Sequence, residues 1–159
     1  MRLPKRMFAL AGMASIIGVA ACSNSSDDAA PKNASNPAPI PVGLKVEDSA
    51  LGKILTDQTG QTLYAFTDDK KGTSACATSC LATWPALLSD KNVSADAGVD
   101  QSKVSTAART EGTSQVTYND WLLYYYVGDV GPGDVDGQAV DGKWFVVSAD
   151  GKLIKSSPN

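Results

Sequence analysis

From residue 44 onward, short apolar runs alternate with segments that contain Gly, Asn and Asp. This alternation is typical of an all-β protein. We expect strands at 51–56, 61–67, 103–109, 114–118, 121–127, 143–148 and 152–155, with the clearest hairpin turns at 57–60, 119–120 and 150–151. One short helical turn is expected over Thr78–Thr83, because Pro85 prevents its continuation.

Two of the expected strands repeat one another, since Leu-Tyr-Ala-Phe-Thr-Asp-Asp at 63–69 aligns with Leu-Tyr-Tyr-Tyr-Val-Gly-Asp at 123–129. Alternate residues of a strand share one face, so Tyr64 is expected to point with Phe66, and Tyr124 with Tyr126. Each aromatic face alone would be exposed to water. The pattern therefore predicts a small sandwich or barrel-like domain in which two pseudo-repeated hairpin units bury these faces against each other.

Each repeated strand is followed by a carboxylate, Asp69 in the first copy and Asp129 in the second. An Asp just past a strand accepts backbone N–H bonds in a turn. The alternative is a hydrolase with paired carboxylates, which needs two carboxyl groups at a set separation with different pKa values. The sequence indicates no cleft and contains no His, the commonest general base. We therefore expect a protein that is not an enzyme.

Residues 1–22 have the features of an export signal. Arg2, Lys5 and Arg6 precede an uncharged stretch at 7–21, which is short for a membrane span. The stretch ends in Val-Ala-Ala-Cys and resembles the lipobox of bacterial lipoproteins, in which the Cys is acylated. We expect a lipoprotein signal peptide at 1–21, a disordered linker attached to lipid at Cys22 over 22–43, and one β-rich domain at 44–159 with its repeat motifs near 51–69 and 114–129.

The amino-acid composition argues against several classes of ligand. The chain has 14 Lys and Arg against 17 Asp and Glu, and this acidic balance argues against binding to nucleic acid. Cleavage after residue 21 would also remove all three Met residues. A chain without His or Met is poorly suited to copper, to most zinc sites and to most haem ligation. No cofactor is expected.

Two cysteines remain once Cys22 carries lipid, and Cys76 and Cys80 are separated by one helical turn in the sequence. Outside the cytoplasm such a pair most simply forms a disulfide. Two alternatives stay open: a redox-active dithiol, which usually has the shorter Cys-x-x-Cys spacing, and a thiolate metal site, which would need further ligands.

The segment 128–137 is rich in Asp and Gly. Its carboxylates, Asp129, Asp134 and Asp136, are weak candidates for calcium ligands, because calcium takes oxygen ligands from flexible loops. The segment lacks the ligand order of an EF-hand, and tight turns require the same residue types. No metal site is expected.

These motifs together resemble the secreted-repeat family of bacterial lipoproteins that is defined by Tyr-x-(Phe/Trp/Tyr)-x-x-Asp. Residues 64–69 fit the first copy of this motif and residues 124–129 fit the second. Further similar segments lie at 74–76, 80, 84–87, 115–119, 133–138 and 142–145, so the resemblance covers about residues 50–151. Asp120 and Leu122 depart from the Gly and Pro that are usual in the family. The resemblance implies a location at the cell envelope and a fold. It implies no activity, because the family has no established biochemical activity.

The sequence as a whole predicts a lipid-anchored envelope or surface protein that acts as a non-catalytic binding or structural module. The resemblance to Gram-negative lipoproteins implies the outer membrane in such a host, because Ser23 rather than Asp follows the Cys. In a host with one membrane, the anchor implies the outer face of the cell membrane. An envelope protein or a glycan is the expected partner besides the membrane itself. Tyr125 is the expected contact residue, unless it packs inside with Leu123. The alternative function is a thiol-disulfide or electron-transfer accessory protein that uses Cys76 and Cys80.

Overall fold

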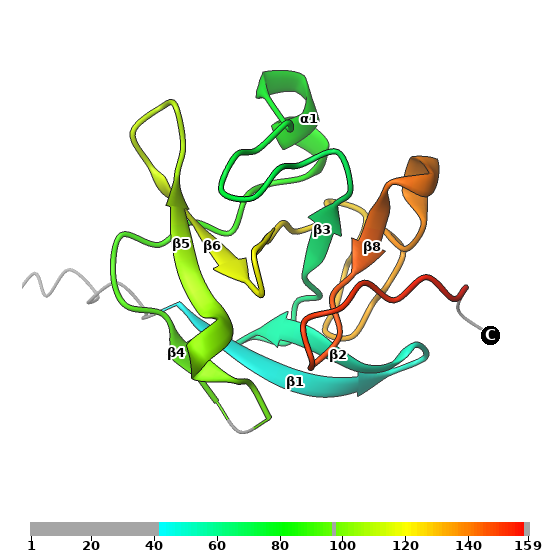
Figure 1. Ribbon diagram of the computed structural model, residues 1–159. Helices are drawn as coiled ribbons and strands as arrows, with labels where there is room; N and C mark the ends of the chain where they lie inside the picture. Colours follow the sequence, from blue (N-terminus) through cyan, green and yellow to red (C-terminus); the bar gives the residue numbers. More distant parts are fainter. Residues whose placement is uncertain (1–41, 97, 158–159) are drawn as a thin grey trace, which may run out of the picture. The chain divides into compact units, whose positions relative to one another are not determined.

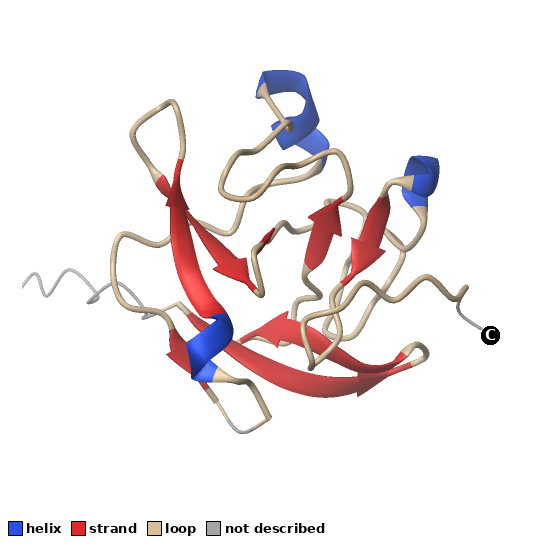
Figure 2. Ribbon diagram, viewed as in Figure 1, coloured by secondary structure: helices blue, strands red, loops and turns tan. Residues whose placement is uncertain are grey.

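Strands dominate the described part of the chain, residues 42–96 and 98–157 of the computed structural model (Figures 1 and 2). The strands are β1 (Gly43–Ser49), β2 (Gly52–Asp57), β3 (Tyr64–Phe66), β4 (Ser94–Ala95), β5 (Val104–Ala108), β6 (Ser114–Tyr118), β7 (Trp121–Leu122) and β8 (Trp144–Val146). The helical elements are α1 (Thr78–Thr83) and two 3-10 turns, η1 (Gln101–Lys103) and η2 (Val140–Gly142). Together these elements confirm the all-β class and the short helical turn next to the cysteine pair.

The strands form three small sheets rather than a closed barrel. Their orders are β2-β1-β4, β3-β8 and β5-β6-β7. The pairs β1-β2, β3-β8, β5-β6 and β6-β7 are antiparallel, whereas β1 and β4 are parallel. The folded part begins at β1, close to the expected start at residue 44.

Local turn chemistry explains why the hairpins form where the sequence predicts them. Asn119 and Asp120 connect β6 to β7 and both have positive φ, 48° and 69°. Two such residues suit the two-residue turn that matches strand twist. Beyond β8, Ser148 donates its N–H to the carbonyl of Lys152 around the turn at 150–151.

Several expected strands are shorter in the structure, the strand expected at 152–155 is reduced to one bridge between Leu153 and Val147, and β1 and β4 were missed. Only Tyr64–Phe66 of 61–67 and Trp121–Leu122 of 121–127 are strands, because the chain leaves each ladder after a few residues. The residues beyond them still make isolated bridges, as Thr62 does with Thr56. The β1 sequence GLKVEDS has only a weak alternation of apolar and polar residues, and β4 is too short to leave a pattern.

The two halves of the described chain, 42–96 and 98–157, exchange strands. In the first half, β3 pairs with β8 of the second half, from Tyr64 opposite Val146 to Phe66 opposite Trp144 (Figure 1). The converse pairing joins 124–127 to 83–86, where Tyr125 donates its N–H to the carbonyl of Pro85 at 2.8 Å. Each aromatic strand is therefore completed by the segment that follows the helical element of the other half.

Backbone hydrogen bonds also connect the two halves where three segments of the chain meet. Leu55 donates its N–H to the carbonyl of Val147, Val147 donates to Leu63, and Leu63 donates to Leu55, which closes a ring of three hydrogen bonds. All three residues are fully buried. A second ring with the same donor order joins Val116, Leu87 and Leu123.

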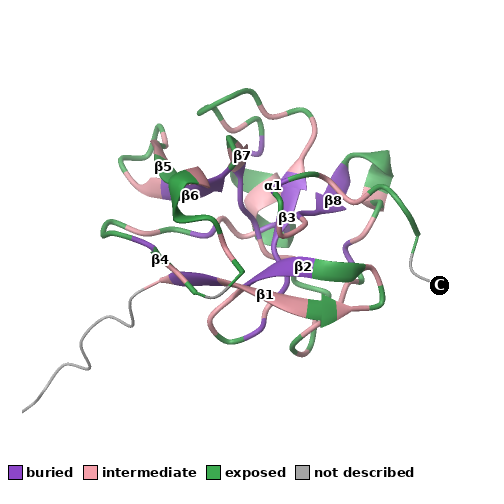
Figure 3. Cartoon of the chain, turned by 60° about the horizontal axis from the view of Figure 1, so that its bottom comes forward, coloured by how far each residue is buried: buried purple, intermediate pink, exposed green. Residues whose placement is uncertain are grey.

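The core consists of two apolar clusters, and the strand period assigns residues to them. In Figure 3 the buried stretches of β2 and β8 are purple. Leu63, Ala65 and Leu123 belong to an aliphatic cluster. Tyr64 and Tyr124, on the alternate face, belong to an aromatic cluster. The two repeated strands thus bury their aromatic faces against each other, as the sequence predicts. Within the described ranges, no helix has the length and apolarity that a membrane span requires.

Candidate functional site: an aromatic groove shared by the two halves

A stack of four aromatic rings lies where the two halves meet. Trp84 and Trp144 occupy equivalent positions in the two repeats, and they stack with ring centroids 3.9 Å apart and planes 1° from parallel. Phe66 stacks on Trp144 at 4.3 Å, and Tyr126 packs on Trp84 at 4.4 Å. The order is therefore Phe66, Trp144, Trp84, Tyr126, with each ring of one half matched by the ring at the equivalent position of the other. An approximate two-fold axis passes between the tryptophans.

The stack lies beneath a groove of about 560 Å³. Five lining residues come from each half. They are Phe66, Ser79, Cys80, Thr83 and Trp84 from the first, and Tyr126, Val140, Asp141, Lys143 and Trp144 from the second. Four of the five pairs occupy equivalent positions in the two repeats. The tryptophans are buried, whereas Ser79, Thr83, Asp141 and Lys143 are exposed at the rim. A groove of this kind exists only when both halves are present.

The motif residues hold the two halves in register through crossed hydrogen bonds. Tyr64 of the first copy donates its hydroxyl to Asp129 of the second at 2.8 Å, and Tyr124 of the second donates to Asp69 of the first, also at 2.8 Å. The backbones of Tyr64 and Tyr124 bond reciprocally as well, with both N–H···O distances at 2.9 Å. Each carboxylate also accepts one backbone N–H, as a turn residue should: Asp69 from Ala75, and Asp129 from Asp136.

Burial changes the proton affinity of this network. It raises the pKa of the Asp69 and Asp129 carboxyls, although the tyrosine hydroxyls and backbone N–H groups lower it in part. Burial also raises the pKa of Tyr124 to about 12 and raises that of Tyr64. At neutral pH both tyrosines therefore remain hydrogen-bond donors.

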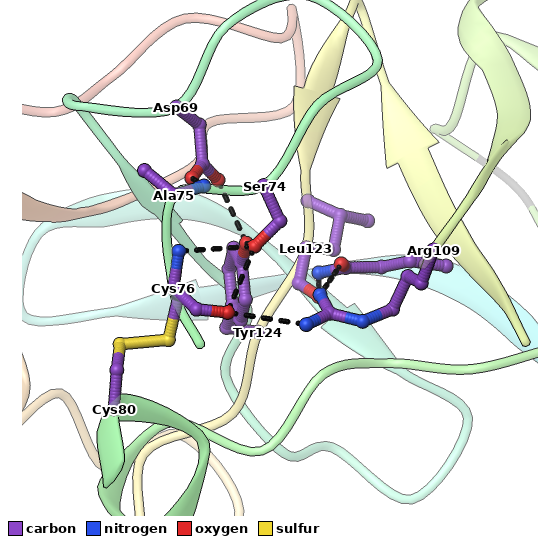
Figure 4. The surroundings of a disulfide bond; sticks show 9 residues. Asp69, Ser74, Ala75, Cys76, Cys80, Arg109, Leu123 and Tyr124 are labelled. Atoms are coloured by element: carbon purple, nitrogen blue, oxygen red, sulfur yellow. Dashed lines mark hydrogen bonds between the residues drawn. A yellow bond between two sulfur atoms is a disulfide. The ribbon is translucent and has the colours of Figure 1, made fainter. Parts of the chain in front are cut away.

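The disulfide expected between Cys76 and Cys80 is present, with Cα atoms 5.2 Å apart (Figure 4). Cys76 is 2% exposed, and its N–H donates to the Ser74 hydroxyl, which in turn bonds the hydroxyl of Tyr124 at 2.7 Å. Its carbonyl accepts from the guanidinium of Arg109. Cys80 lies in α1 and lines the groove. The disulfide thus ties one wall of the groove to the tyrosine-aspartate network.

The opposite wall contains strained backbone. Ala139 and Asp141, which flank Val140 in η2, have φ values of 62° and 53°. Left-handed conformations are uncommon for residues other than Gly, and they are found preferentially at functional sites. Sequence inspection did not identify this wall, because no local signal distinguishes these residues from ordinary turn residues.

The Asp/Gly-rich segment uses its carboxylates to hold its own turns. Asp134 accepts the N–H groups of Val130 and Gly131 at 2.9 and 2.8 Å. Asp129 is engaged by Tyr64, and Asp136 is exposed. In the described ranges, no three His, Cys, Asp or Glu residues are placed to hold a metal ion.

Tyr125 lies on the face away from the stack. It packs against the aliphatic cluster, which includes Leu123, and donates its hydroxyl to Asp57 at 2.9 Å. Burial raises its pKa. Tyr125 therefore packs inside with Leu123, as the alternative interpretation held. The proposed lipid-attachment residue, Cys22, lies outside the described residues.

Comparisons with known proteins agree with the internal symmetry. Residues 45–88 and 105–148 each match a family described as a secreted repeat of unknown function, and the two matches are related by the same offset as the two tryptophans. No curated protein and no solved structure matches the chain significantly.

Proposed function

We propose that the chain, which belongs to a family of secreted repeats of unknown function, is a non-catalytic binding module held at the cell envelope by lipid on Cys22. In a Gram-negative host the anchor would lie in the outer membrane, and otherwise in the outer face of the cell membrane. The partner in this proposal is an envelope component, either a protein or a glycan, and no cofactor takes part.

The groove over the four-ring stack is the observation that carries the proposal. Ligand sites are typically concave, about 300–1,000 Å³ in volume, lined by aromatic groups and supplied with a few polar side chains. The groove has this size, floor and rim. Two other hollows, of about 710 and 680 Å³, have no aromatic lining residue. Both halves contribute to it equally, so a binding role would also explain why the chain carries two copies of the motif.

The acidic motif residues support a non-catalytic role. A pair of catalytic carboxyls must be free to reach a substrate or water. Asp69 and Asp129 each accept a tyrosine hydroxyl and a backbone N–H, so their acceptor sites serve the fold.

A redox role for the cysteine pair remains the second candidate, because Cys80 lines the groove. Thiol titration separates the two functions. A binding module should keep its disulfide in mild reductant, because there the bond joins a groove wall to the tyrosine-aspartate network, whereas a redox protein should release two thiols readily.

Site-specific photo-crosslinking in the host tests the binding proposal. A photoreactive residue at Thr83, on the groove rim, should give an adduct with an envelope component. The same residue at Ala50, exposed in the turn between β1 and β2, should give none. The absence of an adduct at position 83, or equal adducts at both positions, would contradict the proposed site.

Lipid labelling tests the anchor separately. The full chain should incorporate radiolabelled palmitate and fractionate with membranes, and a Cys22→Ser variant should lose both properties. Membrane association that persists without label in this variant would contradict the lipid anchor.

A further inference from the structure

We infer that the aromatic groove binds an uncharged glycan chain. This inference rests on the proposed function of the groove and narrows its ligand to one chemical class. It is carried by the chemistry of the floor, the charge of the rim and the shape of the two walls.

The floor supplies an apolar strip that suits a sugar ring. Phe66 and Tyr126 lie at the two ends of the stack and are half-buried, and they line the groove together with the buried tryptophans. Aromatic rings combine a large apolar area with a directional charge distribution. A pyranose presents C–H groups on its faces and hydroxyls around its edge. Such a molecule can cover the floor while its hydroxyls point toward the walls.

The rim offers hydrogen-bond donors and acceptors at both walls. Ser79 and Thr83 on the first wall carry hydroxyls, which donate and accept. Asp141 on the second wall accepts, and Lys143 donates. Neighbouring hydroxyls of a sugar need both kinds of partner, because each one also donates and accepts.

The charges of the rim favour a neutral ligand. Lys143 is the cation of the lining, and its ammonium already pairs with Asp68 at 2.6 Å. Asp141 contributes one negative charge to the same wall. The lining of the groove, which lies wholly in the described ranges, therefore has no unpaired positive charge with which to attract a phosphate or a carboxylate. An anionic polymer would also be repelled by the net negative charge, since residues 22–159 contain 11 Lys and Arg against 17 Asp and Glu.

The walls are fixed before any ligand arrives. The strained residues beside Val140 are held in place, because Ala139 donates its N–H to the carbonyl of Trp144 at 2.8 Å and Val140 packs against the aromatic cluster. The disulfide fixes the other wall through Cys80. A preorganised site loses little conformational entropy when a ligand binds.

A protein partner fits the groove less well. Stable protein interfaces bury about 800 Å² on each side and usually contain exposed apolar anchors. Within the described ranges, the exposed large apolar residues are Leu88, Val127 and Val130, and none of them lines the groove.

Titration of the full chain with uncharged oligosaccharides tests the inference. The probes are hexamers of N-acetylglucosamine, of β-1,4-linked glucose and of α-1,4-linked glucose, measured by isothermal titration calorimetry. At least one should bind saturably at micromolar to millimolar concentration. Asp141→Asn and Thr83→Val should each weaken that binding by about fivefold. Thr83→Val removes a hydroxyl, and Asp141→Asn replaces one acceptor oxygen of the carboxylate by an NH2 donor.

Asp120→Asn is the matched control. Asp120 also has a positive φ, which Asn tolerates, and it lies in the β6–β7 turn outside the groove. This variant should bind the oligosaccharide as the unchanged chain does. Equal affinity of all three variants would overturn the inference.

The crosslinked adduct at position 83 separates failure of this inference from failure of the proposed function. An adduct that mild periodate destroys and protease leaves intact supports a glycan, whichever soluble probes bind. An adduct that protease destroys and periodate leaves intact overturns the glycan inference and leaves the binding function standing. If no adduct forms and no oligosaccharide binds, both fail.

Discussion

At the scale of single residues, the repeated Tyr and Asp of the two motif copies act between the two halves. Tyr64 reaches Asp129 and Tyr124 reaches Asp69, so neither copy of the motif satisfies its own carboxylate with its own tyrosine. A carboxylate that accepts a hydroxyl forms a stronger bond than a neutral acceptor does. The motif therefore acts as a clasp that fixes the groove-forming halves in register.

Removing one of the two tyrosine hydroxyls that bond across the halves should destabilise the fold. Tyr64→Phe and Tyr124→Phe should each lower the free energy of unfolding by about 1–3 kcal/mol, because the partner carboxylate loses a donor in a partly buried site. Urea denaturation measures this change. Tyr126→Phe is the control, since its hydroxyl makes no hydrogen bond to any described residue. A similar loss in all three variants would show that the crossed bonds contribute nothing specific.

The same carboxyls should give stability a distinct pH dependence. Burial raises the pKa of Asp69 and Asp129 in the folded state, so folding favours their protonated forms. Their contribution to stability is full below the ordinary pKa of about 3.9 and is lost as pH rises through the higher folded value.

We therefore expect the stability advantage of the unchanged chain over an Asp69→Asn/Asp129→Asn variant to grow as pH falls from 7 to 4. Urea unfolding of both proteins at several pH values measures this difference. The other titratable groups are the same in both proteins, so their contributions cancel when the two free energies of unfolding are subtracted. A difference that shrinks on acidification would mean that the folded pKa values are lowered rather than raised.

At the scale of elements, exchange between the halves determines which strands form. The β8 strand completes β3, and the segment 83–86 completes 124–127, so each half depends on the other for a sheet partner. This pairing also requires the Asp/Gly-rich segment 128–137 to approach the aromatic cluster closely. Gly137 lies so near the clasp that a Cβ there would come within 2.8 Å of the Tyr64 ring and 2.9 Å of Trp84.

Gly137→Ala should therefore destabilise the protein by about 1–3 kcal/mol, as overpacking in a closed site does. Gly131→Ala, in the same Asp/Gly-rich segment, is the control, because the nearest atom to its Cβ would be 3.8 Å away. Thermal unfolding followed by circular dichroism compares the two variants. Equal transition temperatures would contradict the close packing of Gly137.

The sequence predicts the local elements better than their partners. The hairpins around 119–120 and 150–151, the helical turn at Thr78–Thr83 and the disulfide follow from turn residues, Pro85 and cysteine spacing. The internal repeat also predicts that the aromatic faces meet. No local pattern shows that β8 pairs with β3, because that pairing joins residues far apart in the sequence. The groove was missed for the same reason, since its lining comes from both halves.

At the scale of the whole molecule, the fold is one interlocked unit made from two repeats. Both rings of three backbone hydrogen bonds combine residues of the two halves, and the Trp84–Trp144 contact lies between them. Neither repeat can complete its sheets or the groove alone. The family match to two separate copies therefore describes two pieces of a single folding unit.

Cleavage between the repeats tests this interlocking. A specific protease site inserted between Asp90 and Lys91, which lie in an exposed stretch, should be cut in the folded protein. The two fragments should stay together in size-exclusion chromatography until denaturant is added, because strand pairs from both directions connect them. Fragments that separate in buffer alone would show that the exchange contributes little to the assembly.

The most direct measurement of the central claim, that the two repeats build one binding groove, is an NMR titration of the three indole N–H signals with envelope material from the host. Trp84 and Trp144 line the groove, whereas Trp121 lies outside it and serves as an internal reference. The account predicts that the Trp84 and Trp144 signals shift together and saturate while the Trp121 signal stays in place. Shifts confined to Trp121, or no shift of any indole signal, would contradict it.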